Sequence, residues 1–247
     1  MFERVGRSPL LLAALLVASG AIGAGLYALI APVLGGGDDA RIERLVKDTI
    51  LENPELLPQA MDNLRNREVG QAVASNRAAI TEPFGNAWEG NPEGDVTLVA
   101  YMDYACGYCR TSLPVIERLV ASDPNLRVVY RELPVLSEQS RIAAQWSLAA
   151  AEQGKFIEYH DALYAAGQLS EATIEAAIDR AGLDRTRGSA IAGSPRASEE
   201  INRNLGVAGQ LGMSGTPSWV VGDRMLSGAL PFEALQQAVR AARAANQ

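Results

Sequence analysis

The stretch Val96-Thr-Leu-Val-Ala-Tyr-Met-Asp-Tyr-Ala-Cys-Gly-Tyr-Cys109 joins an apolar run to a pair of cysteines. The apolar run 96–102 predicts a buried strand, and the residues from about Cys106 to Val120 predict a helix. A cysteine at a helix N-terminus lies beside unpaired amide groups and the positive end of the helix dipole, which stabilise a thiolate. The second cysteine, on the same first turn, can attack a mixed disulfide and release the substrate. The spacing therefore predicts a redox-active pair.

Other interpretations of Cys106 and Cys109 are open. A structural disulfide across two residues closes a very small loop and restricts the unfolded chain little. A zinc site needs about four ligands, whereas the sequence has two cysteines and one histidine, His160. Two thiolates suit Cu(I), which prefers sulfur ligands. We expect thiol–disulfide exchange without a metal or cofactor, and a Cu(I)-binding copper-tolerance protein is the alternative of another class.

The composition is that of an ordinary globular protein. The 247 residues are 48% hydrophobic and 21% charged, with a formal net charge of −7. A negative net charge disfavours nucleic acid and an anionic membrane surface as main partners. We therefore expect no nucleic-acid partner.

The N-terminal part of the chain contains a long uncharged segment. Residues 10–30 carry no charged side chain, and Arg4 and Arg7 precede them. This length can span a bilayer, and the positive-inside rule places the N-terminus in the cytoplasm. We predict that residues 1–36 form a cytoplasmic tip and an inner-membrane anchor, with a cleaved signal peptide as the alternative. Both interpretations place the cysteines in the periplasm, where disulfide chemistry is usual.

Residues 37–82 predict a helical N-terminal segment. Asn53-Pro54 is typical of the end of one helix and the start of another. Apolar residues recur at helical spacing on both sides of this break, namely at Ile42, Leu45, Val46, Ile50, Leu57, Met61 and Leu64. Short helices cannot bury such faces on each other alone. We predict either homo-oligomerisation through residues 37–82 or packing of this segment on the parent domain.

Residues 83–247 predict an α/β domain. Alternating residues in 125–132 indicate a second strand, and residues 137–211 are Ala-rich and helical, with glycine breaks. Two short runs around Gly222-Asp223 predict a hairpin, followed by a helix that ends near Ala244. The order of strand, helix, strand, helical block, hairpin and helix predicts an α/β domain with an all-α insertion at about 137–211.

Three motifs give this domain a resemblance to a known family. The stretch 96–109 resembles the active-site region of DsbA-like thioredoxin-fold disulfide oxidoreductases. Residues 153–163 resemble their helical-insert motif, and Gly215-Thr-Pro-Ser-Trp219 resembles their cis-proline loop. The resemblance extends over about 84–242 and implies a thioredoxin-like fold. The N-terminal segment, with Glu52-Asn-Pro-Glu55, resembles that of the suppressor of copper sensitivity C proteins (ScsC), which use such a segment to oligomerise.

The resemblance also implies roles for individual residues. Cys106 would be the nucleophile and Cys109 the resolving thiol, and together they would form the redox-active disulfide. Thr216, Pro217 and Tyr108 would bind substrate, and the proline loop would pair with an extended peptide segment. The implied partners are cysteine-containing envelope proteins and a membrane thiol–disulfide electron-transfer protein.

Two departures from the family pattern bear on the direction of electron flow. The position six residues before the first cysteine, usually acidic, is Ala100; Glu132 and Asp103 are candidates to replace that acid. The dipeptide between the cysteines is Gly-Tyr, as in the disulfide isomerase DsbC, and Thr216 before the proline also resembles DsbC. Such residues tune the redox potential. We therefore expect an isomerase or reductase, with a disulfide-introducing oxidase of DsbA type as the alternative.

Overall fold

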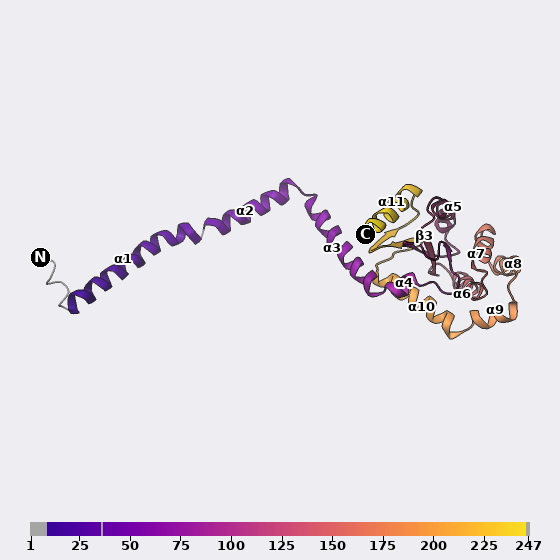
Figure 1. Cartoon of the computed structure of the whole chain (residues 1–247). Coiled ribbons are helices and arrows are strands. Elements are labelled where there is room, and N and C mark those ends of the chain that lie inside the picture. Colours follow the sequence, from indigo (N-terminus) through magenta and orange to yellow (C-terminus); the bar gives the residue numbers. More distant parts are fainter. Residues whose placement is uncertain (1–8, 36, 246–247) are drawn as a thin grey trace. The chain divides into compact units, whose positions relative to one another are not determined.

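The structure, a computed structural model, describes residues 9–35 and 37–245. Arg4 and Arg7, on which the predicted membrane orientation depends, lie outside the described residues. The chain divides into two compact units, one ending at Asn63 and one beginning at Leu64. In Figure 1 the colours follow the sequence, from indigo in α1 to yellow in α11.

The first unit is helical. It contains α1 (Pro9–Gly35), α2 (Gly37–Glu52) and the start of α3 (Leu56–Ser75). Within α1, Leu12–Leu29 is long and apolar enough to cross a membrane, although a signal sequence near an N-terminus would also meet this condition. The predicted break at Asn53-Pro54 separates α2 from α3.

The second unit is built on a five-stranded sheet in the order β1-β3-β2-β4-β5. Its strands are β1 (Trp88–Gly90), β2 (Val96–Met102), β3 (Leu126–Glu132), β4 (Ser218–Val221) and β5 (Arg224–Ser227). β2 is parallel to β3, and the other pairs are antiparallel. Four strands follow the sequence prediction, whereas β1 was not predicted, because three residues are too few for a periodic pattern.

The helices of this unit also follow the prediction. The predicted insertion consists of α6 (Glu138–Glu152), α7 (Phe156–Ala165), α8 (Glu171–Ala181), α9 (Arg185–Ala192) and α10 (Pro195–Gln210). Side chains of Ser137, Ser170, Asp184 and Ser194 cap four of them by accepting backbone N–H bonds. α5 (Gly107–Ser122) and α11 (Phe232–Ala245) complete the unit. The thioredoxin-like α/β fold with an all-α insertion is therefore confirmed.

The sheet is covered on both faces. Leu98, Ala100 and Met102 belong to a core shared with α5, α11 and the insertion. On the other face, Val99 and Tyr101 share a core with Val73, Ile80 of α4 (Arg77–Thr81) and Val207 of α10. Residues 64–82 therefore belong with the sheet, and the sheet-containing unit begins near Leu64, earlier than the predicted boundary at residue 83.

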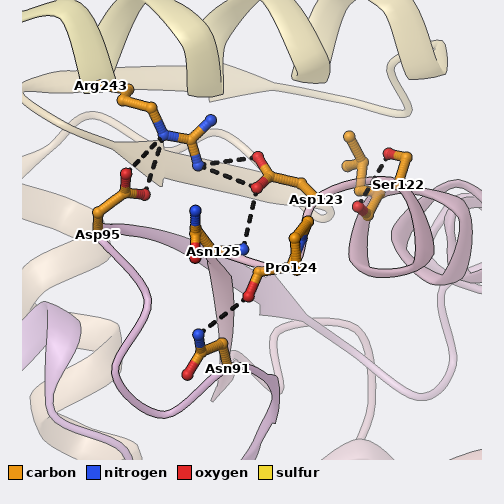
Figure 2. A network of polar contacts seen from close by, with 8 residues as sticks. Asn91, Asp95, Ser122, Asp123, Pro124, Asn125 and Arg243 are labelled. Atoms are coloured by element: carbon orange, nitrogen blue, oxygen red, sulfur yellow. Dashed lines mark hydrogen bonds and ion pairs between the residues drawn. The ribbon is translucent and has the colours of Figure 1, made fainter.

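Arg243 ties α11 to the two elements that carry the cysteines. Its Nε lies 2.8 and 2.9 Å from the carboxylate oxygens of Asp95, just before β2. Its Nη2 lies 2.9 and 3.1 Å from those of Asp123, just after α5. Figure 2 shows Arg243 between the two carboxylates. The network holds the starting end of β2 and the final end of α5 against the C-terminal helix.

Candidate active site

The two cysteines lie where β2 passes into α5. Cys106 is the N-cap residue of α5, and its amide donates to the carbonyl of Asp103 at 3.0 Å. Cys109 lies one turn along. Both thiols are free, and Cys106 is 6% exposed while Cys109 is fully buried. Both cysteines are thus buried, and Cys106 is the more accessible of the two.

The predicted proline loop lies against Cys106. The Thr216–Pro217 peptide bond is cis, and Cys106 Sγ donates to the carbonyl oxygen of Thr216 at 3.2 Å. β4 begins at Ser218, opposite Tyr101 of β2, so the loop sits at the end of β2 that leads to the cysteines. The fold therefore brings Thr216 and Pro217 to the cysteines from more than a hundred residues away.

Tyr108, the other predicted substrate contact, lies between the cysteines on the first turn of α5. Its side chain is 70% exposed. A large apolar ring directed to solvent beside a buried nucleophile is available to a bound peptide.

The thiol of Cys109 is difficult to ionise. Burial raises the pKa of Cys109 to about 12, because the thiolate would lose its hydration, and the neighbouring Cys106 adds to this shift. A backbone hydrogen bond from Asp103 and the side chain of Thr216 act in the opposite direction. The Thr216 hydroxyl is buried and, among the described residues, has no hydrogen-bond partner of normal geometry. It is thus an uncommitted donor close to the sulfur pair.

Glu132 is the buried acid nearest to this region in the sheet. It ends β3 beside Met102, the last residue of β2. The Ser147 hydroxyl donates to Glu132 Oε1 at 2.6 Å, and the Tyr104 hydroxyl lies 3.3 Å from the same oxygen. Burial raises the pKa of Glu132 to about 8, against the effect of the Ser147 hydrogen bond. Its carboxyl is therefore mostly protonated at neutral pH.

Asp103 has a different environment. Its Oδ1 accepts the amide of Ala105 at 2.8 Å, and its Oδ2 accepts the amides of Val135 and Leu136 at 2.9 and 3.0 Å. All three donors are backbone amides, so both oxygens of the side chain are occupied by the main chain. Of the two candidates to replace an acid at Ala100, Asp103 is therefore committed to the backbone, and Glu132 is held among the hydroxyls of the core.

Comparison with known proteins agrees with this geometry. The model of the DSBA-like thioredoxin domain matches residues 97–240. The chain belongs to this family. The model of the copper resistance protein ScsC N-terminal domain matches residues 38–69, so this DSBA-like protein has the two-part layout that the sequence predicted.

Solved structures resemble the DSBA-like unit closely. A thioredoxin-like oxidoreductase from Silicibacter pomeroyi is 39% identical, with a TM-score of 0.65, over 68% of this chain and 98% of that one. A linker-deletion mutant of Proteus mirabilis ScsC is 27% identical, with a TM-score of 0.69, over 84% and 95% of the two chains. These matches support a thioredoxin-fold thiol–disulfide oxidoreductase.

A curated relative of this DSBA-like protein is much longer. The Na(+)/H(+) antiporter NhaA 1 of Salinispora arenicola is 34% identical over 67% of this chain. The chain spans only about a quarter (26%) of that antiporter.

The sequence did not predict that Asp103 accepts three backbone amides from two separate segments. Asp103 lies within the active-site motif 96–109, but nothing in that motif connects it to the loop at 135–136. In the parts of the chain that the structure describes, no group of three or more His, Cys, Asp or Glu side chains could hold a metal ion.

Proposed function

We propose that this protein is a membrane-tethered periplasmic thiol–disulfide oxidoreductase that works as a disulfide isomerase or reductase. Its substrates would be envelope proteins with incorrect or unwanted disulfides. The buried Cys109 supports this direction of the reaction. Its thiolate forms with difficulty, and Ala100, at the position where the family usually has an acid, has no side chain that could accept the proton.

The reaction begins with the thiolate of Cys106. It attacks one sulfur of a substrate disulfide, a new S–S bond joins Cys106 to the substrate, and the other substrate sulfur leaves as a thiolate. The carbonyl of Thr216 loses its contact with the Cys106 thiol when the mixed disulfide forms, and the proline loop then faces the substrate backbone.

Two steps can follow. A second thiol of the substrate can attack the mixed disulfide, which frees Cys106 and leaves a rearranged substrate with no net electron transfer. Alternatively, Cys109 attacks, and the substrate leaves with two electrons while Cys106–Cys109 becomes a disulfide. Because Cys109 is rarely ionised near neutral pH, the second step is slow and the substrate has time to rearrange. A membrane thiol–disulfide partner would return the oxidised pair to the dithiol.

Refolding of a protein with scrambled disulfides tests this proposal. The reduced protein should restore activity to the scrambled substrate, and Cys106→Ser should abolish the effect. Cys109→Ser should retain part of it and accumulate mixed disulfides. Thiol trapping in cells should find the pair mainly reduced. Rapid oxidation of a reduced substrate without recovery of the scrambled one would support the oxidase instead.

Brief alkylation tests the assignment of the two roles. Cys106, at a helix N-terminus and the more accessible thiol, should be labelled well before Cys109 at a pH of about 6. Peptide mapping by mass spectrometry measures the order. Earlier labelling of Cys109 would reverse the roles.

The proposed location rests on α1. Its apolar span Leu12–Leu29 is long enough for an anchor, and a "periplasmic thioredoxin-like protein" of Salmonella enterica is among the similar structures, at 28% identity. An anchored chain should stay in the membrane fraction after a high-salt wash and begin at its original N-terminus. A soluble form shortened near residue 20 would support the signal peptide.

We also propose that the first unit mediates self-association. The exposed apolar side chains of α2, which include Ile42, Leu45 and Val46, are each more than half exposed. The match of residues 38–69 to the ScsC N-terminal domain supports the same view.

A further inference from the structure

A cavity of about 420 Å³ lies at the end of the sheet remote from the cysteines. β2 begins at this end, with Val96 and Thr97 in the cavity wall, and runs from there toward Cys106. The turn between β4 and β5 and the helices α4 and α11 complete the wall. The described lining residues are therefore separate from the candidate active site.

Three guanidinium groups from three elements line this cavity: Arg77 begins α4, Arg127 lies in β3, and Arg224 begins β5. Arg127 is held in place, because its Nε and Nη2 donate to the hydroxyl oxygen of Thr97 at 3.1 and 2.9 Å. Its Nη1 lies 3.4 Å from the carbonyl oxygen of Pro92. None of the three arginines forms an ion pair with a described carboxylate. Their charges are therefore available to an anionic ligand.

The acidic groups of the lining do not cancel this charge. The carboxylate of Asp95 is already paired, because both of its oxygens accept from Arg243 at 2.8 and 2.9 Å (Figure 2). Asp223, in the turn before β5, is the other lining carboxylate. Three guanidinium groups thus line the cavity together with one carboxylate that has no ion pair, in a chain of net charge −7. This local surplus suits a phosphate monoester, which carries about −1.5 to −2 near neutral pH.

The cavity also has room for a small organic phosphate. Its volume lies in the range of about 300–1,000 Å³ that is typical of small-molecule sites. In the described lining, α11 contributes only alanines, so its side chains leave space for a ligand. The hydroxyl of Thr97 accepts from Arg127 and donates to no described group, so its hydrogen can go to a ligand oxygen.

We propose that this cavity binds a phosphate-bearing ligand, with Arg77, Arg127 and Arg224 as its cationic contacts. A phosphate has more acceptor oxygens and more charge than a single carboxylate, so it can engage three guanidinium groups at once. A soluble phosphate monoester and a phospholipid headgroup both present this group. The site goes beyond the proposed thiol–disulfide activity and does not depend on it.

Calorimetric titration of the full-length protein in a neutral detergent tests the site. Glycerol 3-phosphate should bind saturably, and glycerol, which lacks the phosphate, should not bind. Arg77→Gln and Arg224→Gln should each weaken binding about tenfold, because each removes a charge-assisted hydrogen bond. Both positions are exposed, so the variants should fold as the wild type does. Arg180→Gln, at an exposed position on α8 outside the lining, should leave the affinity unchanged.

Asp223→Asn tests the site in the opposite direction. Removal of the negative charge from the lining should tighten the binding of glycerol 3-phosphate about two- to fivefold. Glu199→Gln makes the same change of net charge at an exposed position on α10 and should have no such effect. Equal tightening in both variants would mean that net charge alone governs binding, and it would overturn the proposal.

Native mass spectrometry of protein extracted from membranes separates the two sources of phosphate. A lipid ligand should remain on the wild type and be lost from Arg77→Gln/Arg224→Gln, whereas a soluble ligand predicts the same lipid content in both. Absence of saturable binding of glycerol 3-phosphate to the wild type would overturn the proposed site. Equal affinity in the wild type, Arg77→Gln and Arg224→Gln would also overturn it, because the phosphate would then bind elsewhere. Neither result would affect the proposed thiol–disulfide activity, which the refolding assay tests separately.

Discussion

The hydroxyl of Thr216 is buried near Cys109 without a committed hydrogen bond. A thiolate in the reduced protein can accept this hydrogen, whereas the disulfide of the oxidised protein carries no charge to stabilise. Thr216→Val keeps the shape and removes the donor. The reduction potential should therefore fall by roughly 20 mV, which corresponds to about 1 kcal/mol for two electrons. Equilibration with glutathione measures the change.

Thr216→Ser is the matched control because it retains a hydroxyl. Its potential should stay closer to that of the wild type than the potential of the valine variant. Equal potentials in the wild type and the valine variant would mean that the hydroxyl does not reach the thiolate.

Glu132 should make stability depend on pH. Burial raises the pKa of this carboxyl from 4.5 to about 8, so the folded protein holds a proton that the unfolded chain releases. The associated stability is fully present below about pH 4.5 and is lost as the pH rises to about 8. The Glu132→Gln variant has no titrating group at this position, so this pH dependence is absent from it. Between pH 5 and 8 the wild type should therefore lose roughly 2–5 kcal/mol of unfolding free energy relative to the variant.

Urea unfolding of both proteins across this pH range provides the measurement. Comparing the two proteins cancels the other titrating groups, among them His160, whose pKa burial lowers to about 3. Glu199→Gln, an exposed position on α10, serves as the control and should give no comparable trend. A constant difference between wild type and Glu132→Gln would show that the carboxyl is already ionised at pH 5.

At the scale of elements, the sequence predicted those with a long or regular pattern. The apolar run 96–102 is strand β2, and the alternation in 125–132 is strand β3. The insertion appeared as Ala-rich segments separated by glycines, and Gly154, Gly167 and Gly182 indeed have positive φ between helices. In the candidate site, the cysteine spacing and Thr216-Pro217 could be read directly because both are local motifs.

Features that depend on distant contacts could not be read in this way. Apolar residues recur at helical spacing in both α2 and α3. Ile42 and Leu45 of α2 are exposed, whereas Val73 of α3 packs on the sheet. The guanidinium of Arg131 donates to the carbonyls of Ile80 and Glu82 and so holds the end of α4. Neither contact has a local signal. The same reason explains why the link from Asp103 to Val135 and Leu136 was not predicted.

Arg243 provides a test of how the elements around the cysteines are held together. Its ion pairs with Asp95 and Asp123 (Figure 2) are partly shielded from water, and the positive charge also lies in the last turn of α11. Arg243→Met should lower the unfolding free energy by about 1–2 kcal/mol. Arg240→Met, at an exposed position on the same helix, should cost less than half of this. Denaturant unfolding at low and high salt measures both.

The effect of Arg243→Met should shrink at high salt, because salt screens partly exposed ion pairs. The equilibrium with glutathione should stay close to that of the wild type, since the network lies at the end of β2 remote from Cys106. A large change in that equilibrium would mean that the α5 end held by Asp123 affects the cysteines.

The whole molecule contains two units with different surfaces. Val73 and Ile80 are buried against the sheet, so a chain beginning at residue 83 would lose part of its core. By contrast, Ile42 and Leu45 of α2 are 56% and 55% exposed. Apolar faces of this kind usually find a partner. A second copy of the same segment can supply an equivalent face.

We therefore expect the chain from residue 38 onward to form an oligomer through α2 and the start of α3. Ile42→Lys/Leu45→Lys should weaken association by roughly 3–5 kcal/mol, or a hundredfold or more, because two apolar side chains that the oligomer would bury become charged. Asp48→Lys places a lysine on the same helix without removing an apolar residue and should remain associated. Light scattering at micromolar concentration gives the mass of each. A monomeric wild type would contradict self-association and leave α2 as a spacer between the anchor and the redox unit.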